Sequence, residues 1–171
     1  ELGRSTHPDL GFRAAIDDAE LALACSSHGA EPMHTETVKR WLERIQLGED
    51  ALECGPHAAN HEATAHAMLE QHLRYGRIHN NCSGKHTGML TTSRYFGEET
   101  RGYIEREHPA QQRWFDSLGE MAGIDLRALP WNRDGCGIPV IAMPLTAMAT
   151  AFARIAVPDD LAPTRADAIN R

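Results

Sequence analysis

The sequence predicts a mainly helical chain with at most a few short strands, organised as a single domain over residues 1–171. Apolar residues recur at helical spacing along most of the chain, and Gly or Pro marks where the helical segments start or stop. The stretch 129–140 is rich in Pro and Gly and is predicted to be a loop around a short extended piece. The sequence contains no internal repeat, low-complexity tract or linker that would divide it.

Three helices are predicted in the first half of the chain. The first opens at Asp17, which can form a capping box with Glu20, and it runs to Cys25. The other two are predicted over 35–47 and 60–75, and a glycine follows each. The side chains expected to be buried are Val38, Trp41, Leu42 and Ile45 in the second helix and Ala65, Met68, Leu69, His72 and Leu73 in the third.

Four more helices are predicted in the second half. Ser83 is expected to cap one of them, and Pro109 begins another that Gly123 closes. An apolar helix follows Pro144, with the inward side chains Leu145, Met148, Phe152 and Ile155. The last helix starts at Pro163 and has no C-terminal cap, so we expect the chain to be a fragment.

Composition excludes several classes of function. The net charge of −7 and the lack of clustered Lys and Arg argue against a nucleic-acid partner. No apolar stretch approaches a membrane span, and the N-terminus lacks the regions of a signal peptide. The four cysteines show no disulfide framework, so the expected location is the reducing cytoplasm.

The most informative motif is Cys82-Ser83-Gly84-Lys85-His86, where a short extended segment turns into a helix. A helix N-terminus favours the thiolate form of Cys82, and Lys85 lies one turn later on the same side. Cys82 is therefore either a metal ligand, joined by a neutral Lys85, or a nucleophile with Lys85 as its base. Both roles require a depressed Lys85 pKa. A third interpretation is a buried structural cysteine beside a solvated lysine.

A second sulfur occurs far along the chain, in Asp134-Gly135-Cys136-Gly137. Two glycines around Cys136 let the backbone wrap tightly, and two thiolates with a nitrogen suit zinc. Asp134 and His86 could orient the ligands and the substrate.

Two further segments are candidate site loops. Ser27, in Ser26-Ser27-His28-Gly29, is either an exposed nucleophile or part of a capping turn, and His28 is not automatically its base. The turn at Cys54-Gly55-Pro56-His57 is equally explained by its Gly and Pro. No phosphate-binding glycine loop, His-Glu-x-x-His motif or dinucleotide fingerprint occurs.

Taken in order, five blocks resemble the asparaginase II-like family of zinc-containing L-asparaginases. They are Ser26-Ser27-His28-Gly29-Ala30-Glu31, Cys54-Gly55-Pro56-His57, Ile78-His79-Asn80-Asn81-Cys82-Ser83-Gly84-Lys85-His86, Asp134-Gly135-Cys136 and Pro144-Leu145. The resemblance implies an α+β fold of the serine-β-lactamase, penicillin-binding-protein and glutaminase type, mainly helical in this segment and incomplete at both ends. It also implies hydrolysis of L-asparagine to aspartate and ammonia, and a homodimer.

The site residues follow from the same resemblance. Cys82, Lys85 and Cys136 match the zinc ligands, and Ser27 matches one serine of a catalytic apparatus built from two serine–lysine pairs. His86 and Asp134 match positions close to the substrate.

The chain departs from the family pattern in its lysines. The family's Ser-x-x-Lys motif should lie upstream of Ser27, but Ser5 is followed three residues later by Pro8. The only lysines are Lys39, on an amphipathic helix, and Lys85. We therefore expect this chain to be the central part of a hydrolase domain and poorly active alone. The alternatives are a cysteine hydrolase using Cys82 and Lys85, and a catalytically incomplete asparagine-binding or regulatory domain.

Overall fold

The structure is a computed structural model that describes residues 16–170. Ser5, Pro8 and Arg171, which bear on the predictions above, lie outside this range. The helices are α1 (Asp18–Ala24), α2 (Pro32–Arg44), α3 (Glu62–Glu70), α4 (Ser83–Phe96), α5 (Pro109–Ala122), α6 (Leu145–Ala156) and α7 (Pro163–Asn170). Three short 3-10 helices are η1 (Glu49–Ala51), η2 (Arg77–His79) and η3 (Leu126–Ala128), and the strands are β1 (Trp131–Arg133) and β2 (Pro139–Ile141). The predicted mainly helical α+β character is confirmed, whereas the finer fold type stays a prediction.

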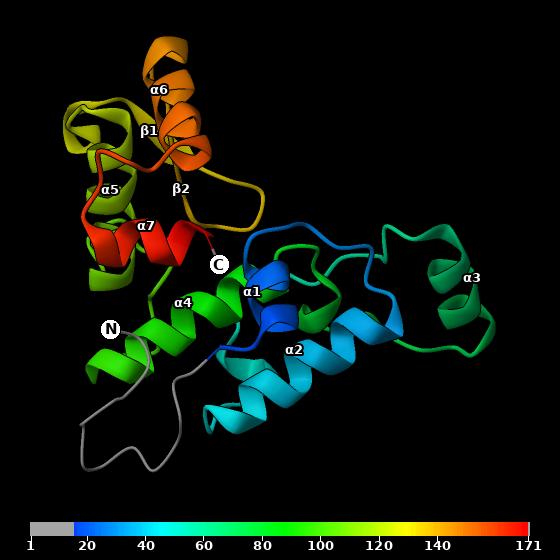
Figure 1. Cartoon of the computed structure of the whole chain (residues 1–171). Coiled ribbons are helices and arrows are strands. Elements are labelled where there is room, and N and C mark those ends of the chain that lie inside the picture. The colour runs from blue at the N-terminus through cyan, green and yellow to red at the C-terminus, as the bar shows by residue number, and fades with distance from the viewer. Residues whose placement is uncertain (1–15, 171) are drawn as a thin grey trace.

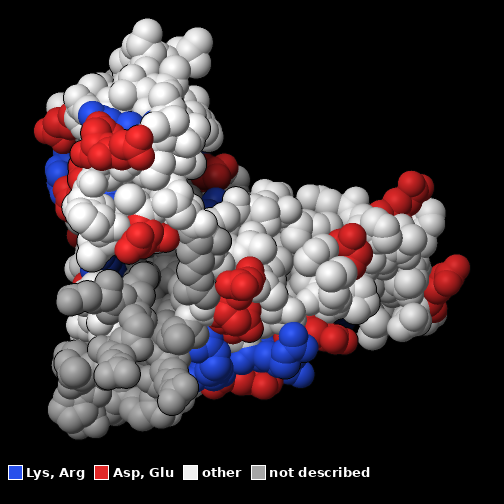
Figure 2. Space-filling view, viewed as in Figure 1, with Lys and Arg blue, Asp and Glu red and all other residues white. Residues whose placement is uncertain are grey.

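The elements form two groups set at an angle to each other (Figure 1). The central group contains α1, α2 and α4, which pack on one another. The C-terminal group contains α5, the β1–β2 hairpin, α6 and α7, and α3 stands apart at the opposite end of the molecule. In the space-filling view, acidic side chains occur on both arms of the molecule and the basic ones form small groups (Figure 2). None of the helices in the described range is long and apolar enough to cross a membrane.

The capping box predicted for α1 is confirmed. The Glu20 N–H donates to Asp17 Oδ1 at 2.8 Å, and the Asp17 N–H donates to Glu20 Oε2 at 3.0 Å. Glu20 is also buried and forms an ion pair with Arg44 of α2. The Glu20 carboxylate therefore completes the capping box of α1 and also links α1 to α2 through an ion pair.

Helix α2 begins at Pro32, earlier than the predicted start at residue 35. Proline is tolerated at the first helical position because its missing N–H has no partner there. The predicted buried face is confirmed, since Val38, Trp41 and Ile45 have no exposed surface. The helix ends before Gln46, whose φ of 60° lies in the left-handed region.

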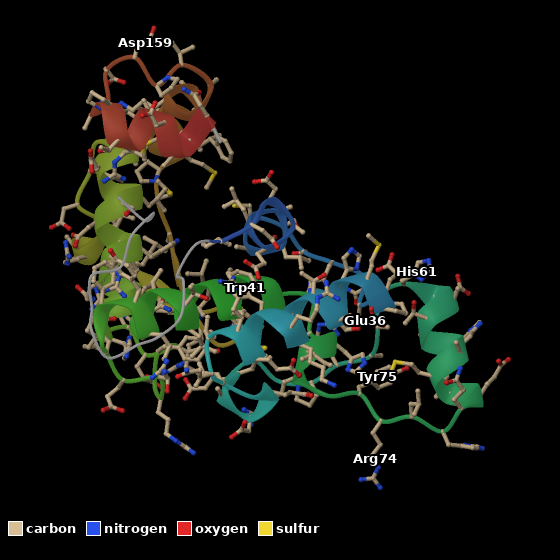
Figure 3. The ribbon with its side chains drawn as sticks, turned by 60° about the horizontal axis from the view of Figure 1, so that its bottom comes forward. Glu36, Trp41, His61, Arg74, Tyr75 and Asp159 are labelled. Atoms are coloured by element: carbon tan, nitrogen blue, oxygen red, sulfur yellow. The ribbon has the colours of Figure 1, made fainter. Side chains whose placement is uncertain are left out.

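Helix α3 is shorter than predicted, and its predicted inward face is only partly correct. It ends at Glu70, because His72 adopts a left-handed φ of 54°. Met68 is buried, but Leu69 is 62% exposed. Since α3 lies at the edge of the molecule, it has few neighbours against which a whole apolar face could pack (Figure 3).

A close crossing of α1 and α4 is made possible by Gly84. A Cβ atom at this position would lie 2.5 Å from the Leu23 carbonyl oxygen, which is too close for any side chain. The prediction that Ser83 caps α4 was wrong: Cys82 occupies the N-cap position and Ser83 is the first helical residue. The Ser83 hydroxyl instead donates to the Ile78 carbonyl at 2.9 Å.

The C-terminal group confirms the helix bounded by Pro109 and Gly123, whose φ is 70°. The expected extended piece is an antiparallel hairpin in which Asn132 pairs with Val140. Helix α6 follows Pro144 as predicted, but its predicted inward face was wrong. The small residues Ala147 and Ala151 are buried in the cluster formed with α5, whereas Leu145, Met148, Phe152 and Ile155 are exposed.

Candidate functional site

The structure brings Cys82, Lys85 and Cys136 together, and we call these three residues the thiol–amine site. Cys82 stands at the start of α4 and Lys85 is one turn further on, close enough for the Cys82 sulfur to raise the pKa of Lys85. Cys136 comes from the turn between β1 and β2, and its charge acts on Lys85 as well. Two distant parts of the chain therefore supply the two sulfurs.

The turn that carries Cys136 is organised by Asp134. The Asp134 carbonyl accepts the Gly137 N–H at 2.9 Å, and its side chain accepts the Gly135 N–H at 2.6 Å. Gly137 has a φ of 96°, which favours glycine. The turn buries Cys136 at 5% exposure, in the same apolar cluster as Trp41 and Leu90. Only Gly137 requires glycine in this turn, because a Cβ atom at Gly135 would meet open space.

Asp134 also faces the basic and thiol groups of the site. Its Oδ2 lies 3.9 Å from Lys85 Nζ and accepts a hydrogen bond from Cys136 Sγ at 3.7 Å. The Asp134 side chain is about half exposed, so this carboxylate lies at the boundary between the site and solvent. Its contacts reach both Lys85 and Cys136, and a role in orienting ligands or substrate stays a prediction.

The pKa of Lys85 is raised, not depressed as the sequence argument required. Burial acts to lower the pKa of Lys85, but the Cys136 and Cys82 thiolates and the Asp134 carboxylate outweigh it. Without a bound metal, this direction favours the ammonium form of Lys85. Burial also raises the pKa of the Cys136 thiol, with Lys85 opposing the shift.

The donor set suits zinc by its chemistry. Two soft sulfurs and one nitrogen are the kinds of atom that zinc binds in proteins. Between residues 16 and 170, no three His, Cys, Asp or Glu side chains converge as a metal site. The proposed set contains only two such residues and depends on Lys85 for its third donor, so it differs from the common cysteine–histidine sites. A nearby dication favours the neutral form of an amine, which would counter the raised pKa of Lys85.

Ser27 is exposed and lies three residues beyond Ala24, the last residue of α1. The next residue, His28, donates its backbone N–H to the Asn81 carbonyl at 3.1 Å, and Cys82 comes next after Asn81. This contact holds the Ser27 segment against the segment that starts α4. The loop that contains Ser27 is therefore held beside the residues that precede Cys82, and the catalytic role of Ser27 stays a prediction.

His28 is not available as a base for Ser27. Its Nδ1 accepts the Ala30 N–H at 3.2 Å, so the ring proton lies on Nε2, which contacts Ser83 Oγ at 2.9 Å. Ser83 can accept from His28 because its own proton goes to the Ile78 carbonyl. Burial, with a further contribution from His34, lowers the pKa of His28 to about 4. His28 is a neutral structural link between the Ser27 loop and α4.

His86 is fully buried behind the thiol–amine site. Its Nδ1 lies 2.7 Å from the Tyr103 hydroxyl, which also accepts the Glu53 N–H at 2.8 Å. The other ring nitrogen, Nε2, is buried without a hydrogen-bond partner among the described residues. Burial and the neighbouring Lys85 lower the pKa of His86 to about 4. A direct contact between His86 and substrate stays a prediction.

Tyr103 is a site residue that the sequence analysis missed. It belongs to none of the five motif blocks, and nothing in its neighbours marks it as special. Cys54, by contrast, lies near the two site sulfurs, but its Sγ is directed at the Arg77 carbonyl. Burial raises the pKa of Cys54 to about 12, so this thiol stays protonated.

Comparison with known families places this geometry in context. Residues 9–171 match the sequence profile described as L-asparaginase II. The chain belongs to the L-asparaginase II family. No curated protein matches it.

Membership of the L-asparaginase II family points to an amidohydrolase acting on a small-molecule substrate. The match covers all the residues discussed above, from Ser27 to Cys136. The same five blocks that carry the resemblance in the sequence also contain the residues that converge in the structure. Tyr103 and Glu53 extend this arrangement into a buried second layer.

Proposed function

We propose that this chain contributes the zinc site, Cys82, Lys85 and Cys136, and the serine Ser27 to an L-asparaginase that hydrolyses L-asparagine to L-aspartate and ammonia. The observation that carries the proposal is the convergence of these three side chains from α4 and the β1–β2 turn. Family membership supplies the reaction class. The serine-β-lactamase-like fold belongs to the same proposal, and the helices with a small antiparallel hairpin are compatible with it.

The thiol–amine site would bind zinc through two sulfurs and the Lys85 nitrogen, which leaves room for a further ligand. When bound, zinc supplies positive charge that helps to hold the substrate. Asp134 fixes the turn that delivers Cys136, and it restrains Lys85. Removal of the Asp134 carboxylate should therefore loosen the site even though Asp134 is not itself a ligand.

Ser27 is the proposed nucleophile. Its Oγ attacks the side-chain amide carbon of asparagine and its proton passes to a base. The base then delivers this proton to the amide nitrogen, and the C–N bond breaks to release ammonia. Water then hydrolyses the resulting ester, which gives aspartate and restores the serine. Exposure of Ser27 at the end of α1 is what this role requires, because a substrate must reach the oxygen.

The base for Ser27 is not found within the described residues. Lys39 is exposed on α2, Lys85 belongs to the thiol–amine site, and both ring nitrogens of His28 are engaged. These are the only two lysines in the sequence. We therefore expect the 171-residue chain on its own to release ammonia from asparagine slowly or not at all.

Zinc content tests the proposal without relying on activity. We expect about one zinc per chain in the unaltered protein by elemental analysis, and loss of most of it in C82S and C136S. The matched control is C25S, because Cys25 is an exposed cysteine at the end of α1. Equal zinc in C82S and C25S would contradict the proposed site.

Thiol labelling and asparagine binding separate the alternatives. A metal-free protein whose Cys82 reacts with iodoacetamide much faster than Cys25 would support the cysteine hydrolase instead. Saturable asparagine binding without turnover, after a lysine base has been restored beside Ser27, would support a binding or regulatory domain. Zinc that protects Cys82 and Cys136 from labelling supports the asparaginase.

A further inference from the structure

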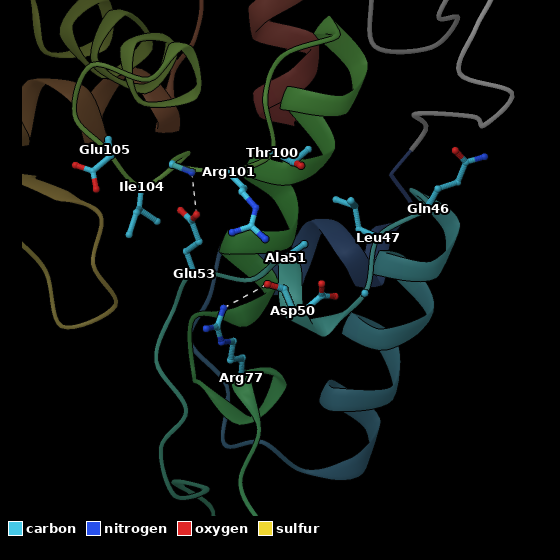
Figure 4. Close-up of a pocket in the computed structure, with 12 residues that line it drawn as sticks. Gln46, Leu47, Asp50, Ala51, Glu53, Arg77, Thr100, Arg101, Ile104 and Glu105 are labelled. Carbon is cyan, nitrogen blue, oxygen red and sulfur yellow. Dashed lines mark hydrogen bonds between the residues drawn. The ribbon is translucent and has the colours of Figure 1, made fainter.

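A cavity of about 670 Å³ lies between η1 and the loop of residues 100–105, apart from the thiol–amine site. Neither Cys82, Lys85 nor Cys136 lines it. Its size falls within the range of small-molecule sites. The charged side chains that line it are Asp50, Glu53, Arg77, Arg101 and Glu105 (Figure 4).

Two of these five charged groups are already engaged. The Arg77 guanidinium donates to the carbonyls of Leu52 and Asp50 and so forms part of the wall. Glu105 forms an ion pair with Arg133. The charge of Glu105 is therefore paired, whereas Arg77 keeps its positive charge but directs Nη1 at backbone carbonyls of the wall.

The remaining charged groups lack partners for their charges. Within residues 16–170, Arg101 and the Asp50 carboxylate form no ion pair, although both are exposed to the cavity. Glu53 accepts the Gly102 N–H through Oε1 at 2.8 Å, but its Oε2 is unpaired. Figure 4 shows Arg101 reaching into the space between Glu53 and Asp50. The cavity therefore presents both signs of charge, and neither neutralises the other.

A ligand with one sign of charge would fit this lining poorly. A simple anion would pair with Arg101 but would be repelled by Asp50 and Glu53, and a simple cation would meet the reverse problem. A small molecule with a carboxylate and an ammonium group close together satisfies both. We propose that the cavity binds a free zwitterionic amino acid, with its carboxylate on Arg101 and its ammonium group on Asp50.

The cavity is linked by hydrogen bonds to the residues behind the thiol–amine site. Gly102, next to Arg101, donates to Glu53, and the Glu53 N–H in turn donates to the Tyr103 hydroxyl. Tyr103 contacts His86, the neighbour of Lys85. A ligand bound to Arg101 would contact the loop of residues 100–105. The backbone amide chemical shifts of Gly102 and Glu53 should therefore change on binding.

Titration of the ¹⁵N-labelled full chain with glycine and with L-serine, followed by amide chemical shifts, tests the proposal. We expect saturable shifts of the Gly102 and Glu53 amides with both amino acids. Acetate and methylammonium, each with one of the two charges, should give at most a tenth of the affinity. Because binding is the readout, the result does not depend on whether the chain hydrolyses asparagine.

Variants R101Q and D50N should each weaken glycine binding at least tenfold. R74Q is the matched control, because Arg74 is exposed near α3 and points away from the molecule (Figure 3). A dispersed amide spectrum identifies variants that keep the fold. Acetate binding as tight as glycine binding, no saturable shift with any probe, or equal affinity in R101Q and R74Q would each overturn the proposal.

Discussion

The central group and the C-terminal group differ in how far their apolar faces find partners. In the central group, Trp41 and Ile45 of α2 are wholly buried. In the C-terminal group, α6 buries its alanines against α5 and leaves Phe152 65% exposed. Both helices have a clear apolar face in the sequence. The comparison teaches that helical spacing identifies the face that favours burial, but not whether the chain provides a partner for it.

The largest expected effect on stability comes from truncating a buried side chain of α2. W41A should lower the free energy of unfolding by roughly 3–5 kcal/mol, because it removes a fully buried indole from the core. F152A, an aromatic truncation in exposed α6, should change it by less than about 0.5 kcal/mol. Urea unfolding followed by circular dichroism measures both. Similar losses in the two variants would mean that α6 is covered in solution.

The second prediction concerns pH and the buried link at His28. The pKa of His28 is about 4 in the folded chain and about 6.5 when unfolded, so the unfolded state binds the proton more readily. Stability should therefore be highest above pH 6.5 and fall by up to about 3 kcal/mol from this residue as pH drops to 4. Urea unfolding at several pH values gives the slope.

The matched variants for this slope are H28Q and H66Q. His66 is exposed on α3, so H66Q should keep the full pH dependence. H28Q should lose part of it, but not all, because His86 is buried and its pKa is also about 4. An identical slope in both variants would show that His28 is protonated without cost in the folded chain.

The third prediction concerns the close crossing of α1 and α4 in the central group. G84A should destabilise the protein by about 1–3 kcal/mol, because the new methyl group collides with the Leu23 carbonyl of α1. G88A, one turn along the same helix, would meet the Ala24 Cβ at 3.4 Å and the Trp41 ring at 3.7 Å, which are ordinary contact distances. This change should be neutral or stabilise by up to about 1 kcal/mol, as Gly to Ala does in helices. Thermal unfolding distinguishes the two, and a greater loss in G88A would contradict the crossing geometry.

The smallest effect on stability is expected on the exposed face of α6. The double variant F152E/I155E should change the free energy of unfolding by less than about 0.5 kcal/mol, because both side chains are exposed. It should also reduce self-association, because it breaks an apolar surface. Sedimentation velocity at several concentrations measures this. Unchanged association would place the predicted homodimer contact elsewhere.

Local signals in the sequence predicted much of the fold. The capping box at Asp17 and Glu20, the Pro109 start and the Gly123 end depend on residues within one turn, so they could be identified without tertiary contacts. The prediction for Ser83 was wrong because its hydroxyl donates to the Ile78 carbonyl, five residues earlier in the chain, and does not cap the helix. That contact depends on how η2 packs against α4.

Site residues could be predicted where a sequence motif identifies them. They could not be predicted where their role depends on tertiary packing. Cys82, Lys85 and Cys136 could be proposed from residue type and family resemblance. The raised pKa of Lys85 required knowledge of how close two thiols and Asp134 come. Tyr103 joins the site only because its hydroxyl lies between Glu53 and His86, and no local pattern encodes that position.

The placement of Cys136 at the tip of the β1–β2 turn also bears on how the protein is made. Cys82 leaves the ribosome long before Cys136, and the turn reaches the central group only once Gly135 and Gly137 have been synthesised. Helices α1, α2 and α4 can therefore pack while one sulfur of the pair is still missing. The site is completed only when the turn inserts Cys136 into the core that these helices form.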